Sequence, residues 1–460
     1  MVRRFTHDSP GTPATVWAAR PEWGDVPTWD PLTQPHGPEA LPQWAPPDRV
    51  VVAAAHPDDE SLGAGGLVAT LRAVVPAIPV LLVVATAGER SHPRSPSTTP
   101  AALARIRHEE ARQAWAALGG EPASMVIWDL PDGELATHEE SLTTRLVDIV
   151  GDGRRTLLVT PYDDDGHPDH DALGRAGRRV AHRTGAHLLH FPVWFWHHRD
   201  PATAPWARMR RLPLRPPARQ AKSLAIAHHA SQVAPLSAAP GDETLLGAAL
   251  LEHFGGADEI FIEGSPDDDS FDALHTQSDD PWGTTTRWYE ERKRQVLQAM
   301  LPQPRFRRAL DLGCSTGTQT AELALRCDAV LALDRSPRAV GEAQQRVSGL
   351  PHVEVRVADL PQGWPDGTFD LIVVSESGYF LSPVALDDLI SRVAGSLTPD
   401  GCLVLAHWRH PIVGWPLSGP EVHERFTRSP ELPEVTARYT DRDVEVLVLS
   451  AASTMPNPSR

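Results

Sequence analysis

Lysine is almost absent from this 460-residue chain, which contains only Lys222 and Lys293, so nearly all of its positive charge is arginine. Cysteine is also scarce, and Cys314, Cys327 and Cys402 are odd in number and far apart. This pattern argues against a disulfide framework and fits a reducing compartment. The arginine bias is typical of a GC-rich genome and carries no functional signal.

Positive charge is also scarce, because the 60 acidic residues outnumber the 43 basic ones and the formal net charge is −17. Such a charge argues against wrapping nucleic acid or lying on an anionic membrane. No apolar run reaches the length of a membrane span, and the N-terminus has no signal-peptide core. We therefore expect a cytoplasmic protein that acts on small molecules without membrane insertion, and the sequence leaves its oligomeric state open.

Two polar clusters follow two apolar runs in the first half of the chain. In the stretch Val50–Gly66, small β-formers predict a buried strand, and His56-Pro57-Asp58-Asp59-Glu60 comes directly after it. Gly166-His167-Pro168-Asp169-His170 follows the apolar run Thr156–Pro161 in the same way. Because ligands bind at the carboxyl ends of strands in open α/β sheets, we expect both clusters to meet at one sheet edge.

The meeting of these clusters would suit a catalytic metal. A catalytic zinc ion takes three His or carboxylate ligands and keeps a fourth position for water. His56, Asp59 and His170 supply such a set, and Asp58 is then free to act as general base.

Two further polar residues of the second cluster remain. Asp169 could orient His167 and favour its charged form, which would prepare His167 to stabilise an oxyanion or protonate a leaving amine. Either cluster alone would also fit an acidic turn or a solvated loop, but both in this order favour a catalytic site.

The motif AHPDDE followed far downstream by GHPDH resembles the PIG-L/LmbE-like N-deacetylases, zinc enzymes that remove acetyl from N-acetylglucosamine conjugates and related amides. The resemblance covers roughly residues 48–263 and implies the metal, base and electrophilic roles given above. It also implies that Arg107 contacts the substrate and that Asp132 binds sugar hydroxyls. Without the family, Arg107 would fit a surface ion pair equally well, and Asp132 would fit a turn.

The second half begins with a strand at Arg308–Leu312 that runs into the glycine-bearing turn DLGCSTG. Such a turn lets the backbone approach a ligand closely. Asp334 ends the next strand about 20 positions on, where a carboxylate can hold ribose hydroxyls. A nicotinamide dinucleotide domain would share these features.

This order resembles a class I S-adenosylmethionine-dependent methyltransferase over roughly residues 281–450. The segments Asp-Pro-Trp-Gly, Trp-Tyr-Glu and His-Trp-Arg-His-Pro make it most similar to the NodS-like N-methyltransferases, although Ser315 replaces the middle glycine of the commoner turn. The resemblance implies that the methionine part lies at Gly313, the ribose at Asp334 and the adenine near Asp359. The cofactor-binding residues that we predict are Asp311, Gly313, Ser315, Gly317, Asp334, Asp359 and Glu376.

We therefore predict an α/β chain with two Rossmann-like domains, each a mostly parallel sheet flanked by helices. Within the first domain, the pattern predicts a helix over Ser61–Val75 and a strand over Leu188–Trp196. Four Trp residues in a Pro-rich N-terminal stretch predict an extended arm that packs on this domain. The predicted parts are an arm at 1–47, a deacetylase domain at 48–264, an acidic linker at 265–280 and a methyltransferase domain at 281–460.

The function that we predict is bifunctional. One domain would hydrolyse an N-acetyl group on an amino-sugar-type small molecule with zinc or another divalent metal, and the other could methylate the freed amine with S-adenosylmethionine. In the alternative, a zinc deacetylase acts on a thiol-glycoside conjugate beside an unrelated or regulatory methyltransferase-like domain. A binding protein built from two decayed enzyme folds would be a third reading.

Overall fold

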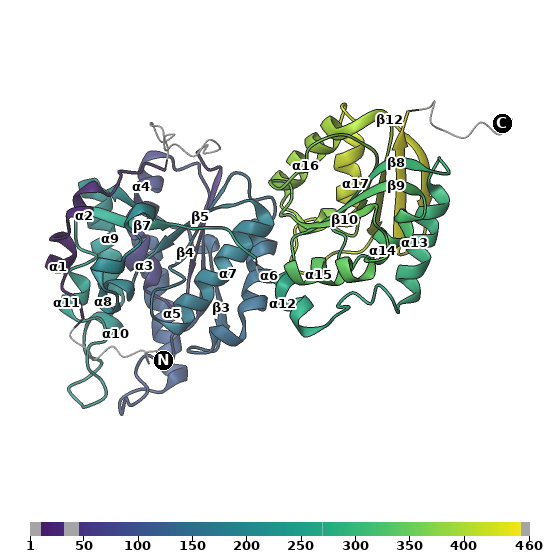
Figure 1. The fold of residues 1–460 in the computed structure, drawn as a ribbon. Helices are drawn as coiled ribbons and strands as arrows, with labels where there is room; N and C mark the ends of the chain where they lie inside the picture. Colours follow the sequence, from purple (N-terminus) through teal and green to yellow (C-terminus); the bar gives the residue numbers. More distant parts are fainter. Residues whose placement is uncertain (1–10, 32–45, 269, 452–460) are drawn as a thin grey trace. The chain divides into compact units, whose positions relative to one another are not determined.

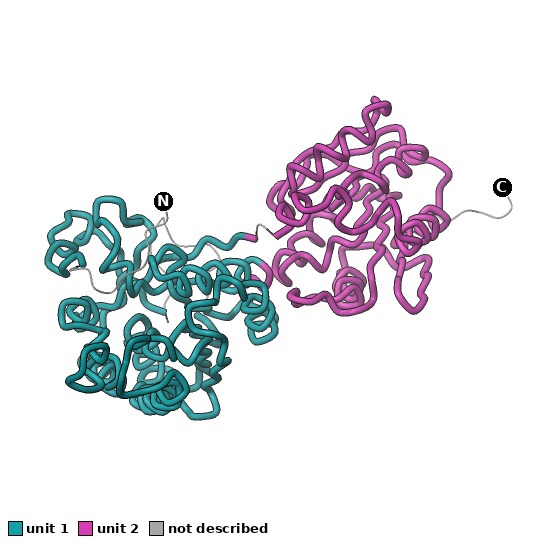
Figure 2. The backbone as a smooth tube through the Cα atoms, turned by 90° about the horizontal axis from the view of Figure 1, so that it is seen from below, with its two compact units in different colours: residues 1–182, 186–267 teal, residues 183–185, 268–460 magenta. Residues whose placement is uncertain are grey.

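The computed structural model describes residues 11–31, 46–268 and 270–451. The chain divides into two compact units, residues 1–182 with 186–267 and residues 183–185 with 268–460, drawn in teal and magenta in Figure 2. The domain boundaries expected from the sequence stay a prediction. Across the described parts of the chain, no helix is both long and apolar enough to span a bilayer.

Unit 1 is built on a seven-stranded sheet of order β3-β2-β1-β4-β5-β7-β6 (Figure 1). The pairs among β1 to β5 are parallel, and β7 runs antiparallel to β5 and β6. Its strands are β1 (Arg49–Ala54), β2 (Val80–Thr86), β3 (Met125–Leu130), β4 (Thr156–Pro161), β5 (His187–Phe191), β6 (Met209–Pro213) and β7 (Asp258–Glu263).

Helices cover both faces of this sheet, because β1 is apolar on both sides. Val50 and Val52 point into a core shared with α4, α5 and α9, whereas Val51 and Ala53 point into a core shared with α6 and α7. The helices are α3 (Asp59–Gly63), α4 (Gly65–Val74), α5 (Pro100–Ala117), α6 (Glu139–Val150), α7 (Pro168–Thr184), α8 (Phe195–His198), α9 (Pro216–His228), α10 (Ala230–Val233) and α11 (Ala248–Leu251).

Unit 2 repeats the same strand order, β10-β9-β8-β11-β12-β14-β13. The pairs among β8 to β12 are parallel, and β14 runs antiparallel to β12 and β13. Its strands are β8 (Phe306–Leu312), β9 (Cys327–Asp334), β10 (Val353–Val357), β11 (Phe369–Ser375), β12 (Leu397–Trp408), β13 (Val435–Thr440) and β14 (Val444–Ser450).

The helices of unit 2 also lie on both faces, with α16 and α17 sharing one core and α13 and α14 sharing another. They are α12 (Ser270–Gln277), α13 (Trp288–Met300), α14 (Thr318–Ala324), α15 (Pro337–Arg346), α16 (Pro383–Ser396) and α17 (Gly419–Arg428). The predicted fold class, two mostly parallel sheets flanked by helices, is confirmed.

The N-terminal arm differs from the extended conformation expected. It contains the short helices α1 (Ala14–Ala18) and α2 (Pro21–Asp25). Trp17 is buried, and its indole N–H donates to the Trp196 carbonyl at 3.0 Å. Packing of the arm through its indoles is therefore observed for Trp17, whereas Trp44 lies outside the described residues.

Three elements of the chain also differ from the sequence pattern. The predicted helix over Ser61–Val75 is divided at Ala64, whose backbone is not helical (φ −134°). The predicted strand over Leu188–Trp196 ends at Phe191 and gives way to α8. Helix α12 lies within residues 265–280, where we expected only a linker.

Candidate functional site

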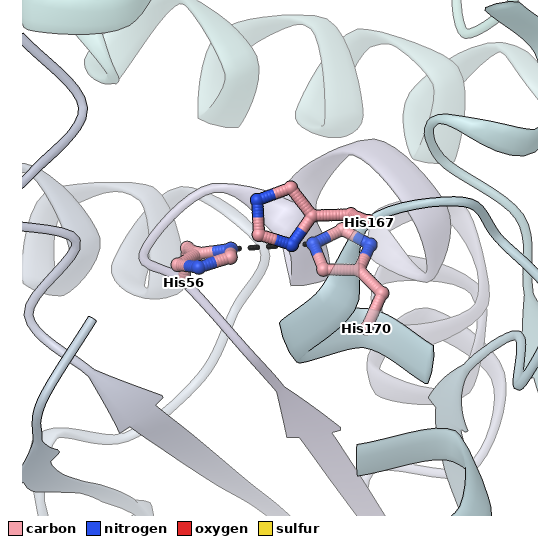
Figure 3. Close-up of side chains that lie close together, drawn as sticks. All are labelled: His56, His167 and His170. Atoms are coloured by element: carbon pink, nitrogen blue, oxygen red, sulfur yellow. Dashed lines mark hydrogen bonds between the residues drawn. The ribbon is translucent and has the colours of Figure 1, made fainter. Parts of the chain in front are cut away.

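The two polar clusters of unit 1 meet at the carboxyl edge of its sheet. β1 and β4 are parallel neighbours, so the residues that follow them emerge side by side. His56 follows β1, Asp59 begins α3, and His170 lies in the first turn of α7; all three are buried. Figure 3 shows the imidazoles of His56, His167 and His170 turned toward one another.

The Nδ1 atom of His56, the Nε2 atom of His170 and the two carboxylate oxygens of Asp59 lie close together at this edge. His56 Nδ1 lies 3.2 Å from His170 Nε2, His170 Nε2 lies 3.2 Å from Asp59 Oδ1, and His56 Nδ1 lies 3.5 Å from Asp59 Oδ2. Atoms bound at about 2.1 Å to one tetrahedral cation are about 3.4 Å apart. The separations therefore fit the predicted ligand set His56, Asp59 and His170.

Two further carboxylates contact the other ring nitrogen of His56. Its Nε2 atom lies 3.2 Å from Asp132 Oδ1 and 3.2 Å from Asp169 Oδ2. A carboxylate on the far nitrogen of a metal-binding imidazole fixes the tautomer and raises the basicity of the ligand. His56, Asp132 and Asp169 also form one of two clusters that could themselves hold a cation, the other being His56, His167 and His170.

Asp132 is therefore placed differently from the role that the resemblance implied. Its carboxylate is buried, contacts His56 through Oδ1 and accepts the Arg90 backbone N–H at 2.8 Å through Oδ2. Burial is the largest effect and opposes ionisation, but the hydrogen bond and charge of His56, the Arg90 N–H and the Arg107 charge together outweigh it and lower the pKa of Asp132. The residue supports an imidazole, and binding of sugar hydroxyls stays a prediction.

The predicted base Asp58 has a strained backbone and a buried carboxylate. Its φ is 144°, which is rare for any residue other than glycine and is typical of functional positions. Burial raises the pKa of Asp58 to about 6, against the nearby Arg107 guanidinium, which lowers it. A carboxylate with a pKa in this range is well suited to accept and return a proton near neutral pH.

Arg107 is buried against Asp58 and is not exposed to solvent. It is 2% exposed, and its Nη2 atom lies 3.0 Å from Asp58 Oδ2. The same guanidinium donates to the carbonyls of Gly88 (2.8 Å) and Pro57 (2.7 Å). This geometry indicates that Arg107 positions Asp58. The expected contact of Arg107 with the substrate stays a prediction that these interactions do not support.

His167 differs from the charged imidazole that we expected beside Asp169. The Asp169 backbone N–H donates to His167 Nδ1 at 3.2 Å, which requires a lone pair on Nδ1. Burial, with the neighbouring His170 and His56, holds the pKa of His167 well below its usual value. The Asp169 carboxylate instead accepts the Gly133 N–H at 2.7 Å. A neutral His167 carries its proton on Nε2.

Asp165, in the acidic run before the second motif, was not predicted from the sequence. Its buried carboxylate lies 2.7 Å from His170 Nδ1. It also accepts the backbone N–H groups of Val193 (2.8 Å), Trp194 (2.9 Å) and Phe195 (2.9 Å). The sequence pattern does not distinguish Asp165 from Asp163 and Asp164, because the backbone groups that bind its carboxylate lie 28 to 30 residues away in sequence.

The glycine-bearing turn of unit 2 has the conformation of a ligand-binding loop. Gly313, Ser315 and Gly317 have φ values of 75°, 47° and 76°. The left-handed value at Ser315 explains why glycine is the commoner residue there. A Cβ atom at Gly313 would lie 2.5 Å from the Ser377 Cβ, so this position requires glycine.

Asp334 closes this turn from the end of β9. It accepts the backbone N–H of Ser315 at 2.8 Å and that of Ser336 at 3.0 Å. Ser315 Oγ is buried and has no hydrogen-bond partner among the described residues. Asp359, by contrast, is largely exposed and lies 3.8 Å from Arg335.

The carboxylates of Asp311 and Glu376 are bound by protein groups. Thr320 Oγ1 donates to Asp311 at 2.7 Å, and burial raises the pKa of Asp311 to about 6. Tyr289 donates to Glu376 at 2.7 Å, and Lys293 Nζ donates to it at 3.1 Å. These contacts favour a structural role, and direct cofactor binding by the two carboxylates stays a prediction.

Comparison with known protein families gives two matches. Residues 51–181 match the PIG-L family, described as GlcNAc-PI de-N-acetylase, and residues 309–401 match a family described as methyltransferase domain. The matches cover separate parts of the chain in the order expected from the two sets of motifs.

Curated relatives agree with this division. Nodulation protein S of Sinorhizobium fredii (strain NBRC 101917 / NGR234) is 34% identical, over 29% of this chain and 64% of its own length. Probable N-acetyl-alpha-D-glucosaminyl L-malate deacetylase 2 of Bacillus subtilis (strain 168) is 34% identical, over 30% of this chain and 62% of its own length. The chain thus spans less than two thirds of each relative.

Among solved structures, N-methyltransferase NodS of Bradyrhizobium japonicum WM9, in complex with S-adenosyl-L-homocysteine, is 25% identical. The match covers 40% of this chain and 100% of that one, with a TM-score of 0.36. The two resemblances inferred from the motifs are confirmed by the family matches, which lie at residues 51–181 and 309–401 of the chain.

Proposed function

We propose that the chain is a bifunctional enzyme, a metal-dependent N-deacetylase joined to an S-adenosylmethionine-dependent methyltransferase. The observation that carries the first activity is the proximity of His56 Nδ1, the Asp59 carboxylate and His170 Nε2, at separations of 3.2 to 3.5 Å, with Asp58 next to Asp59 in the chain. Small-molecule substrates and a cytoplasmic location remain predictions from the sequence.

The donor set fits zinc or another divalent cation, since two imidazoles and one carboxylate leave a coordination position open. A cation bound there would supply Lewis acidity, which polarises an amide carbonyl and makes water a stronger nucleophile. Asp58 takes the proton of the attacking water and delivers it to the departing nitrogen. His167 donates a hydrogen bond from Nε2–H to the developing oxyanion. The amide C–N bond breaks, giving acetate and a free amine.

The second activity is supported by the turn between β8 and α14 and by Asp334. Ser315 Oγ is a buried polar atom that lacks a partner in the described residues, as expected where a polar ligand completes the bonding. When bound, S-adenosylmethionine supplies an electrophilic methyl group on sulfur. Asp334 would hold the ribose hydroxyls and Gly313 would permit close backbone approach, so that an unprotonated nucleophile lies in line with that methyl group.

The two reactions can be consecutive, because the first produces the kind of nucleophile that the second requires. An amide nitrogen is a poor nucleophile, since its lone pair is delocalised, whereas the amine released by deacetylation can accept a methyl group and lose a proton. We therefore infer an acetylated amino-sugar-type molecule as first substrate and its free amine as methyl acceptor.

The test uses the zinc-loaded full chain with N-acetylglucosamine conjugates and S-adenosylmethionine, followed by mass spectrometry. We expect loss of an acetyl group and then gain of a methyl group on the same molecule. Asp58→Asn should block the first step but still methylate an amine supplied directly, and Asp334→Ala should stop after the first step. Deacetylation without methylation of any product by the wild-type chain would contradict consecutive action.

A second candidate substrate has one observation in its favour. The Bacillus subtilis relative is named as a deacetylase of a glucosaminyl malate, which is a glycoside conjugate. In this alternative the chain deacetylates a thiol-glycoside conjugate, and the methyltransferase-like domain is unrelated or regulatory. Rapid deacetylation of such a conjugate, with a product that is never methylated, would favour this alternative.

A further inference from the structure

Helix α12 lies in the segment that we expected to be only a linker, yet it contacts the predicted cofactor site. It packs on α15 within unit 2. Ser336 Oγ, directly after the β9 end, donates to Asp272 Oδ1 at 2.6 Å. The same Ser336 donates its backbone N–H to Asp334. Ser336 therefore links Asp272 to Asp334, the carboxylate that we propose binds the ribose.

Phe271 of α12 makes further contacts at the carboxyl edge of the sheet. Its ring centroid lies 5.0 Å from that of Phe380 and 5.7 Å from that of Trp415. The Arg335 guanidinium lies 5.8 Å from the same ring. Since Arg335 follows β9 and Phe380 follows β11, α12 contacts both sides of the edge at which ligands bind in this fold.

His275 of α12 is buried although one of its polar atoms makes no hydrogen bond to any described residue. The residue is 2% exposed, and its Nδ1 atom has no hydrogen-bond partner among the described residues. It lies one helical turn after Asp272, whose carboxylate accepts the hydroxyl of Ser336, two residues beyond Asp334. Ser315 Oγ, the neighbour of Asp334 through its own backbone N–H, is unpartnered as well.

Buried polar atoms without a partner are rare, because each costs roughly 1–3 kcal/mol when left unsatisfied. Here one of them, Ser315 Oγ, belongs to the residue whose backbone N–H bonds Asp334, and the other, His275 Nδ1, lies on the helix whose Asp272 bonds Ser336. A hydroxyl can donate to the Asp334 carboxylate and still accept a hydrogen bond, so a vicinal diol would satisfy both the carboxylate and a nearby donor.

We propose that His275 is a cofactor-binding residue whose Nδ1–H donates to a ribose hydroxyl that in turn donates to Asp334. This inference rests on the proposed binding of S-adenosylmethionine. It makes the segment between the two catalytic domains part of the methyl-donor site, and it assigns α12 a role in binding beyond that of a connector.

The test is calorimetric titration of the full chain with S-adenosylhomocysteine. His275→Ala should weaken binding about tenfold, the size of one hydrogen bond to a neutral group. Asn places an amide N–H near the position of Nδ1, so His275→Asn should retain most of the affinity, whereas His275→Gln should not. His352→Ala is the matched control, because His352 bonds the Ala324 carbonyl and precedes β10 at the opposite edge of the sheet.

The hydroxyl is identified with the 2′-deoxy and 3′-deoxy analogues of S-adenosylhomocysteine. For one of them, wild type and His275→Ala should bind equally, because the partner of the imidazole is missing. Equal affinity of wild type and His275→Ala for the unmodified ligand would refute this inference alone. A wild-type chain that binds no S-adenosylhomocysteine would refute the proposed methyl donor and the inference with it.

Discussion

Replacement of Asp165 by Asn tests whether His170 is held in the tautomer that a metal requires. Asp165 Oδ2 lies 2.7 Å from His170 Nδ1 and accepts the Trp194 N–H at 2.9 Å. A carboxylate there keeps the proton on Nδ1 and leaves Nε2 free, 3.2 Å from Asp59 Oδ1. In the variant, an amide NH₂ at the Oδ2 position would donate to Nδ1 and move the imidazole proton to Nε2.

The size of the effect follows from the bonds that are lost. Rotating the amide does not rescue the site, because Oδ1 accepts the N–H groups of Val193 and Phe195. With the amide NH₂ at the Oδ2 position the bond from Trp194 is lost, whereas with the NH₂ at the Oδ1 position the bonds from Val193 and Phe195 are both lost, so the first orientation is favoured. Each buried group left unsatisfied costs about 1–3 kcal/mol, so we expect the metal-free variant to be about 1–3 kcal/mol less stable and to bind zinc roughly 10–100-fold more weakly.

Zinc affinity is measured by competition with a chelating dye, and stability by urea unfolding of the metal-free chain. Asp164→Asn is the matched control, because Asp164 belongs to the same acidic run but its side chain is 63% exposed and pairs with Arg199. The control should change neither quantity. Wild-type zinc affinity in Asp165→Asn would show that this carboxylate does not set the tautomer of His170.

Four other expectations follow from the structure. Asp58→Asn should reduce acetate release by about 10²–10⁴-fold while the zinc content, measured by atomic absorption, stays unchanged; loss of the metal would contradict a role as base alone. Removal of the metal with a chelator should abolish deacetylation and leave the calorimetric affinity for S-adenosylhomocysteine unchanged, because the two sites lie in separate units. Lys222→Met leaves the buried Glu259 carboxylate without its cationic partner at 2.7 Å, while the carboxylate still accepts the Gly66 and Leu67 N–H groups, and should lower the free energy of unfolding by about 3–5 kcal/mol; unchanged urea unfolding would contradict this. Trp17→Ala should cost about 3–5 kcal/mol in urea unfolding, and Trp288→Ala, at a site that is 65% exposed, should cost little; equal effects would argue against packing of the arm.

The strands of both sheets could largely be predicted, because a strand buried on both faces is a short apolar run in the sequence. The apolar run Thr156–Pro161 is β4 with the same bounds, and the strand predicted at Arg308–Leu312 begins two residues earlier, at Phe306. The edge strands β6 and β13 were not predicted, since their residues are only partly buried and depend on their neighbours, and β14 between β12 and β13 was not predicted either.

The residues that gather at the carboxyl edge of unit 1 were also found from the sequence. His56, Asp59 and His170 follow or lie near the ends of two strands, and parallel pairing of those strands is enough to bring them together. Their role as metal ligands remains part of the proposed function.

The sequence by itself determined the two domain types, the mostly parallel sheets and the polar residues at the strand ends, because these depend on local patterns and on complete motifs. Only the tertiary structure decided the strand order, the partners of Asp169, Arg107 and Asp165, and the contact of Asp272 with Ser336. These contacts join residues that are far apart in sequence, and their energy comes from burying a polar group against one particular neighbour. No local pattern of residues specifies that neighbour.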